Sequence, residues 1–172
     1  MFYFIYHIPM EYIPWIIVTL VVLWAVIMRA KPEKYDKPAK LINIVMFTIS
    51  VLGIVYITLM RKGTQNREIY LVPLHNFIEA VGETDFYRSM LMNLFLFVPF
   101  GVFATFSLPG KMKTGRKILI TVVAAVVFSA IIEAMQYIFC LGRCETDDVL
   151  CNALGALIGS AAYVLYKIKD RK

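Results

Sequence analysis

Long uncharged stretches separated by short charged segments dominate the pattern of this chain. A helix needs about 20 mostly apolar residues to cross roughly 30 Å of hydrocarbon. Four stretches carry no charged side chain, and a fifth, 118–142, carries only Glu133. We therefore predict an all-α fold: a polytopic membrane helix bundle with five transmembrane helices, forming one integral membrane domain over residues 1–172. The predicted spans are about 12–28, 41–60, 89–109, 118–142 and 149–166, with a long loop at 61–88.

One of these stretches contains helix-breaking residues. Pro99 and Gly101 lie in the middle of 89–109, and proline removes a backbone donor from a helix interior. Pro99-Phe-Gly101 is therefore a candidate break within that single span.

Composition excludes a water-soluble alternative. Hydrophobic residues make up 60% of the chain and charged residues 17%, with a mean hydropathy of +0.70. Soluble domains are nearer half apolar and a quarter charged. A compact body of 172 residues could not bury that much apolar surface. The net charge of +6 therefore needs an explanation within a membrane protein.

The cations predict the orientation, because loops rich in Lys and Arg stay cytoplasmic. Segments 29–40, 111–117 and 167–172 fall on one side and hold thirteen of the eighteen cations. We predict an outside N-terminus, an inside C-terminus and a multi-pass protein of the cell membrane. The cations are divided among short juxtamembrane segments, which disfavours a nucleic-acid partner, since that needs one basic folded surface.

Polar residues converge at the predicted outer ends of three spans. Glu133 and Gln136 share a helix face, and Asp148 and Asn152 share another. Ionisable residues in a membrane are functional-site candidates, because burying them is costly. We therefore expect a site at the outer interface. Its candidate catalytic residues are Glu133, Asp147 and Asp148, and its candidate ligand-binding residues are Asn93, Gln136, Arg143, Asn152 and His75.

Simpler structural roles compete with several of these assignments. Asp147 or Asp148 could cap the last helix, and His75 could be only a hydrogen-bonding loop residue, the favoured reading for a lone histidine. Gly155 and Gly159 are interpreted first as a helix-packing face. If Glu133 pairs with Arg143, the chain must fold back after 141–142, and Gly142 makes a turn there plausible.

The cysteines leave a choice open. Cys140 and Cys144 flank the predicted outer turn, so a bridge between them is one hypothesis. Buried, inert thiols are the favoured alternative, above all for Cys151.

Together these motifs resemble the VanZ-like family. They are Asn93-Leu-Phe-Leu-Phe-Val-Pro99-Phe-Gly101, Glu133-Ala-Met-Gln136, Arg143, Asp147-Asp148, Asn152-Ala-Leu-Gly155-Ala-Leu-Ile-Gly159 and, upstream, Leu71-Val-Pro73-Leu74. The likeness covers about residues 58–159. Tyr70 stands where the family often has Asn, and Leu74 where it often has Phe. The resemblance implies an integral membrane protein associated with resistance to teicoplanin-type glycopeptide antibiotics.

Three functions are compatible with this reading. The first is binding of a membrane lipid headgroup or a lipid-linked envelope precursor, with Arg143 holding an anionic group. The second is an intramembrane hydrolase or transferase, with Glu133 as general base and Asp147 and Asp148 holding a divalent cation. The third is a small lipid transporter or flippase. The sequence requires no cofactor and leaves the metal, the ligand's identity and the oligomeric state open.

Overall fold

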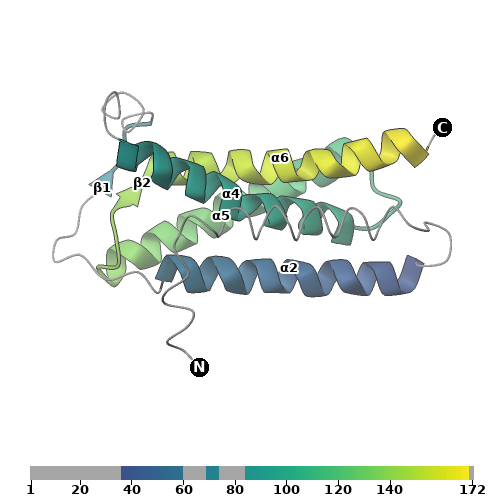
Figure 1. Cartoon of the computed structure of the whole chain (residues 1–172), viewed down its shortest axis with the longest axis horizontal. Coiled ribbons are helices and arrows are strands. Elements are labelled where there is room, and N and C mark those ends of the chain that lie inside the picture. The colour runs from purple at the N-terminus through teal and green to yellow at the C-terminus, as the bar shows by residue number, and fades with distance from the viewer. Residues whose placement is uncertain (1–35, 60–68, 74–83, 171–172) are drawn as a thin grey trace.

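A bundle of long helices makes up the described part of the chain (Figure 1). The computed structural model describes residues 36–59, 69–73 and 84–170. The predicted first span, 12–28, and most of loop 61–88 lie outside the described residues. The described helices are α2 (Asp36–Leu59), α4 (Thr84–Ser107), α5 (Thr114–Ile138) and α6 (Thr146–Asp170).

The described helices match four of the five predicted spans. Each of α2, α4, α5 and α6 is long and apolar enough to cross a membrane. That part of the prediction is confirmed, while the fifth span and the orientation stay predictions. The observed bounds differ from the predicted ones: α4 begins five residues earlier than expected, at Thr84, and α6 continues to Asp170, whereas α5 ends at Ile138 rather than at 142.

The candidate break at Pro99 does not occur. α4 runs as one helix from Thr84 to Ser107 with Pro99 inside it. The proline lacks the N–H that would bond to the carbonyl one turn earlier, which costs one helical hydrogen bond. Unwinding the helix in an apolar environment would leave still more backbone groups unpaired, so the continuous helix is preferred.

A two-residue parallel ladder closes one end of the bundle. β1 (Ile69–Tyr70) pairs with β2 (Cys144–Glu145), so that Ile69 lies opposite Cys144 and Tyr70 opposite Glu145. Figure 1 shows both strands at the end away from the C-terminus. We call this end, which contains β1, β2 and the turn between α5 and α6, the turn end.

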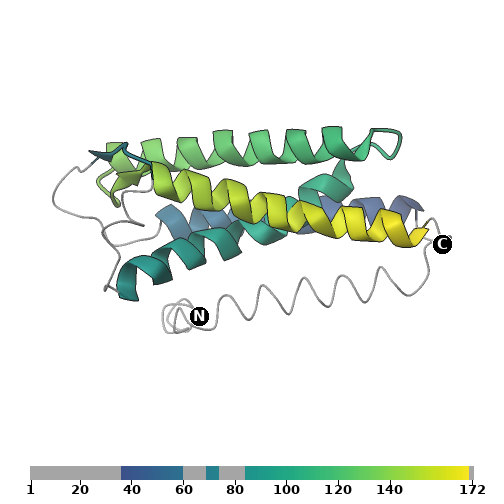
Figure 2. The ribbon, with the colours of Figure 1, turned by 90° about the horizontal axis from the view of Figure 1, so that it is seen from above.

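Small residues set the close approach of α4 and α6. A Cβ atom on Gly155 would overlap the carbonyl oxygen of Leu94, and one on Gly159 would overlap that of Val98. From the other side, a Cβ atom on Gly101 would overlap the carbonyl oxygen of Ala156. The two helices run in the same direction and touch through their backbones, as small residues allow between membrane helices (Figure 2).

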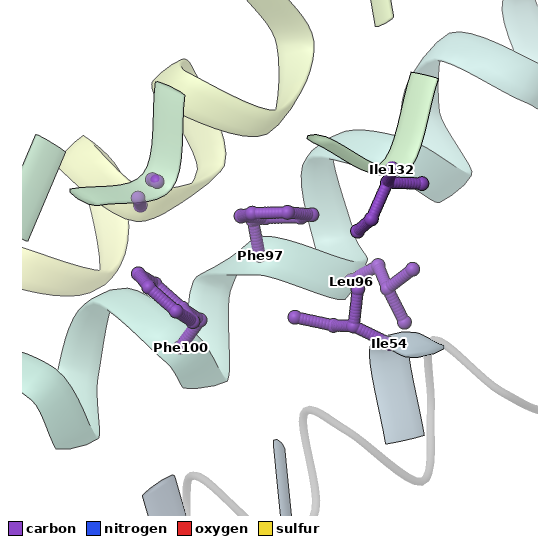
Figure 3. Packing of buried hydrophobic residues seen from close by; sticks show 7 residues of the cluster. Ile54, Leu96, Phe97, Phe100 and Ile132 are labelled. Atoms are coloured by element: carbon purple, nitrogen blue, oxygen red, sulfur yellow. The ribbon is translucent and has the colours of Figure 1, made fainter. Parts of the chain in front are cut away.

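The apolar core is built around the phenylalanines of α4. Phe97 is fully buried and packs with Phe100, Ile54 of α2 and Ile132 of α5. Figure 3 shows these side chains converging from three helices. The rings of Phe100 and Phe128 stack with centroids 5.9 Å apart. This cluster fills the middle of the bundle with side chains.

Three helices present buried residues at four-residue spacing to a common axis. On α5 these are Lys117, Thr121, Ala125, Ser129 and Glu133. On α6 the stripe is Asp148, Asn152, Ala156 and Ser160, and on α4 it is Asn93, Phe97, Gly101 and Thr105. Both ends of this axis are polar, whereas Phe97, Ala125 and Ala156 form a fully buried apolar layer between them.

Away from the turn end, the axis ends in a buried lysine. The sequence pattern placed Lys117 in the loop before the fourth span, and this loop position is wrong: Lys117 lies in the first turn of α5 and is 1% exposed. Its Nζ donates to the carbonyl of Leu108 (3.1 Å) and to the hydroxyl of Tyr163 (2.9 Å). Lys117 therefore satisfies a carbonyl at the C-terminal end of α4, where a cation is favourable.

Buried hydroxyls form the next layer of the axis. The Thr105 hydroxyl donates to Ser160 Oγ (2.9 Å) and lies 3.1 Å from Thr121 Oγ1. All three hydroxyl groups are almost fully buried. They join α4, α5 and α6 by hydrogen bonds at the end away from the turn.

Candidate functional site at the turn end

Glu133 is the buried acid on α5 at the turn end. Its side chain is 4% exposed, and its Oε2 accepts a 3.0 Å hydrogen bond from the backbone N–H of Glu145. Because Glu145 lies twelve residues further on, this bond shows that the chain folds back over the end of α5. A buried charge needs such partners to offset the loss of water.

A left-handed residue produces this reversal. α5 ends at Ile138 with Phe139 as its C-cap, after which Leu141 N–H bonds to Gln136 O (2.8 Å) and Cys140 N–H to Tyr137 O (3.4 Å). This pair of bonds is the Schellman motif, which requires a left-handed residue directly after the helix cap. That residue is Cys140, with φ of 54°, rather than Gly142. The chain turns earlier than the glycine suggested.

The two aspartates lie at the start of α6. Asp147 and Asp148 occupy its first turn and are 2% and 8% exposed. A carboxylate is favourable there because it faces the positive end of the helix dipole. Their position is thus compatible with capping as well as with a ligand site, and their deep burial next to Glu133 distinguishes them from ordinary surface caps.

Below the aspartates lies a pair of buried asparagines. Asn152 Nδ2 donates a 2.7 Å hydrogen bond to Ser129 Oγ, which joins α6 to α5. Within the part of the chain that the structure describes, Asn152 Oδ1 and Asn93 Nδ2 have no hydrogen-bond partner. Asn93 is 8% exposed and Asn152 5%. Two buried amide groups thus keep unused hydrogen-bonding capacity, which is uncommon in native structures.

Arg143 lies on the exposed side of the α5–α6 turn. Its guanidinium is 5.8 Å from the centre of the Tyr70 ring, a cation–π distance. Tyr70 is held there by the ladder between β1 and β2. Tyr70 stands where the VanZ-like family often has asparagine. Its aromatic ring therefore lies against the Arg143 guanidinium.

The structure separates the other predicted ligand residues. Gln136 Nε2 donates a 3.2 Å hydrogen bond to the backbone carbonyl of Thr58, in the last turn of α2. It thereby satisfies a carbonyl at the end of that helix. Since Asn152 Nδ2 bonds to Ser129, the amide donors expected to surround one anion are partly engaged elsewhere. His75 lies outside the described residues.

No disulfide bond joins Cys140, Cys144 and Cys151 in this structure. Burial, followed by repulsion from the carboxylates of Glu133, Glu145 and Asp148, raises the pKa of the Cys144 thiol above its ordinary value. Cys144 therefore lies among the acids of the turn end and carries its proton at neutral pH.

Metal coordination has limited support from these side chains. Among the residues that the structure describes, no three His, Cys, Asp or Glu side chains are grouped so as to hold a metal ion. Carboxylates of Glu133, Asp147 and Asp148 gather at one end of the bundle without forming such a set.

We define the turn-end site as six of the buried polar residues that three helices bring to this end, leaving out Gln136, whose amide bonds to Thr58. Sequence reasoning missed only Ser129 among them, although its four-residue spacing from Glu133 was a readable signal. The six residues are Asn93, Ser129, Glu133, Asp147, Asp148 and Asn152.

Comparison with known proteins identifies the family. The model of the family described as VanZ/LLP1 matches residues 15–167, which is most of the chain. Neither the curated proteins nor the solved structures contain a match. The matched region includes α2, α4 and α5 in full, α6 as far as Lys167, and every residue of the turn-end site. The chain therefore belongs to the VanZ/LLP1 family.

Proposed function

We propose that this multi-pass protein of the cell membrane binds the polar headgroup of a lipid, or of a lipid-linked envelope precursor, at the turn end. The observation that carries the proposal is the turn-end site: six buried polar side chains from α4, α5 and α6 gathered at one end of an apolar bundle. Burying so many polar groups is costly, and in membrane proteins such groups usually serve a ligand.

The surroundings of the site suit a lipid. Large apolar side chains close to the turn end are exposed on the bundle surface: Ile138, Phe139, Leu150 and Leu154. They offer a surface for acyl chains beside the polar residues. Arg143, exposed above them, has the planar guanidinium that binds phosphate through two parallel hydrogen bonds. A lipid could thus place its phosphate at Arg143 and its tails against α5 and α6.

The biological role follows from the family and from the predicted topology. With the N-terminus outside, the turn end faces the outer leaflet, where envelope precursors and glycopeptide antibiotics meet. By altering access to such a precursor, or by binding the acyl chain of the antibiotic, the protein contributes to resistance to teicoplanin-type compounds.

Two alternatives receive less support. A metal-assisted hydrolase needs a set of metal ligands, and none gathers in a group of three within the described residues. A transporter needs a polar path across the bundle, whereas Phe97, Ala125 and Ala156 form a fully buried apolar layer on the axis. Lipid binding requires neither feature.

The test is Arg143→Ala in the full-length protein, with Arg116→Ala as a matched control. Both arginines are exposed, but Arg116 lies at the start of α5, away from the turn end. Mass spectrometry measures the lipids that co-purify, and growth assays measure teicoplanin susceptibility of cells expressing each variant. We expect Arg143→Ala to lose bound lipid and resistance, and Arg116→Ala to keep both. Retention of both by Arg143→Ala would refute the proposal.

A further inference from the structure

We propose that Asn93 and Asn152 form a subsite for an uncharged, hydroxyl-rich group, of the kind presented by a sugar headgroup. The inference rests on the proposed lipid-binding function and specifies which part of the ligand enters the bundle. Its starting point is that both side chains are more than nine-tenths buried, yet each keeps a polar atom without a partner among the described residues.

The side chain of Asn152 has a fixed orientation. Its Nδ2 donates a 2.7 Å hydrogen bond to Ser129 Oγ, and Ser129 is fully buried on α5. With the amide nitrogen engaged, Asn152 presents its carbonyl oxygen, a hydrogen-bond acceptor. Ser129 is therefore a positioning residue for this acceptor.

Asn93 lies on α4 at a level close to that of Asn152. Along the α4–α6 contact, Gly101 lies against Ala156 and Thr105 bonds to Ser160. Nearer the turn end, Gly155 lies against the carbonyl of Leu94, so Asn93 and Asn152 each lie within about one turn of this contact on their helices. The unpaired donor of Asn93 and the unpaired acceptor of Asn152 are thus presented at neighbouring levels of one helix interface.

A donor next to an acceptor suits a hydroxyl group. A hydroxyl group can accept from Asn93 Nδ2 while it donates to Asn152 Oδ1, so one hydroxyl or two adjacent hydroxyls would satisfy both amides. Anionic oxygens cannot donate to Asn152. They would also be repelled by the buried carboxylates of Glu133, Asp147 and Asp148 at the same end. These acids are instead good acceptors for further sugar hydroxyls.

Arg143 and the two asparagines therefore bind different parts of the headgroup. Arg143 lies exposed at the rim, where a phosphate can stay close to water, whereas the buried asparagines receive the neutral part of the headgroup. The ligand class is a glycolipid or a lipid-linked glycan.

The experiment measures lipid binding by native mass spectrometry in phosphatidylcholine nanodiscs that contain either diglucosyldiacylglycerol or phosphatidic acid. The first lipid carries sugar hydroxyls without phosphate, and the second carries phosphate without a hydroxylated headgroup. We expect the full chain to bind the glycolipid, and Asn93→Leu to weaken this binding about tenfold, the effect of one lost hydrogen bond. Thermal unfolding of the lipid-free protein is measured in parallel.

The stability measurement separates a ligand site from structural glue. Leucine replaces an amide donor that has no described partner, so Asn93→Leu should unfold at the same temperature as the parent or higher. Asn43→Leu is the control: Asn43 is buried in α2 and has an interaction partner, so its replacement should lower stability and leave glycolipid binding unchanged.

Four outcomes would overturn the inference. Glycolipid binding that is unaffected by Asn93→Leu would assign the asparagines to packing or to bound water. Binding of phosphatidic acid alone, dependent on Arg143, would refute the sugar subsite while leaving the proposed function intact. Failure of the parent to bind either lipid would refute both. Loss of stability in Asn93→Leu equal to that in Asn43→Leu would also count against a ligand role.

Discussion

The backbone N–H of Glu145 donates a 3.0 Å hydrogen bond to the carboxylate of Glu133. This bond fixes the turn between α5 and α6 against the buried acid. Any substitution of Glu133 therefore tests two properties, the charge of the site and the anchoring of the turn.

Glu133→Gln and Glu133→Leu should separate these properties. Glutamine keeps an oxygen that accepts from Glu145 N–H, so stability should change little, whereas leucine leaves that N–H without this partner and should cost about 1–3 kcal/mol. Thermal unfolding in detergent measures the difference. If Gln and Leu destabilise equally, the hydrogen bond to Glu145 does not hold the turn.

The glycines at the α4–α6 contact give a second prediction. Gly155→Ala places a Cβ atom on the carbonyl oxygen of Leu94, a rigid backbone group, and should destabilise the protein by about 1–3 kcal/mol. Gly53→Ala is the matched control, because nothing lies within 4 Å of its Cβ position in α2. That change should stabilise by roughly 0.5–1 kcal/mol, since alanine is the better helix former. Equal melting temperatures for the two variants would contradict the close approach.

Lys117 gives a third prediction, at the other end of the axis. Lys117→Met removes the donor to the Leu108 carbonyl and the Tyr163 hydroxyl, and leaves two acceptors unsatisfied, at a cost of about 1–3 kcal/mol. Arg116→Met, the exposed neighbour on α5, should change the free energy of unfolding by less than about 0.5 kcal/mol. Chemical denaturation compares the two. If Lys117 were solvent-exposed in a loop, both variants would have the same free energy of unfolding.

The fourth prediction concerns the left-handed residue of the turn. Cys140→Gly should be neutral or stabilising by roughly 1 kcal/mol, because glycine adopts positive φ without the steric cost of a Cβ atom. Cys140→Val should destabilise, since a β-branched side chain is strongly disfavoured at φ near 54°. Melting temperatures in detergent provide the test, and a valine variant as stable as glycine would contradict the Schellman geometry.

The helices were predictable because long uncharged stretches leave few alternatives in a membrane. The stripe Asp148, Asn152, Gly155 and Gly159 could also be read from spacing alone, and all four residues are buried in the structure. Lys117 was misplaced because a lysine at the edge of an apolar stretch looks like a loop cation, although its four-residue spacing from Thr121 was visible.

Other features depend on geometry that spacing does not encode. The bond between Glu133 and Glu145 requires the left-handed backbone at Cys140, a residue type that seldom adopts it. The engagement of Gln136 by Thr58 joins residues seventy-eight positions apart, so only the packing of α5 against α2 reveals it. Pro99 disfavours a helix locally, yet it lies inside the continuous helix α4. The helix persists because backbone groups must be paired in an apolar environment.

The last prediction uses the Cys144 thiol as a reporter of the acids at the turn end. Its pKa is raised by burial first and then by the carboxylates of Glu133, Glu145 and Asp148. Only the thiolate is alkylated at a useful rate, so the midpoint of alkylation should lie at higher pH in the folded protein than in the denatured one. The measurement uses a variant in which Cys140→Gly and Cys151→Ala leave Cys144 as the single thiol, with iodoacetamide labelling followed by mass spectrometry.

The sign of the linked stability effect follows from the raised pKa. The folded state favours the protonated thiol, so the stabilisation by Cys144 is fully present below the pKa of the unfolded thiol. It is lost as pH rises through the folded pKa. Glu133→Gln removes one of the repelling carboxylates, so the alkylation midpoint should move down while staying above that of the denatured chain, because burial remains. An unchanged midpoint in Glu133→Gln would show that Glu133 and Cys144 do not share one electrostatic environment.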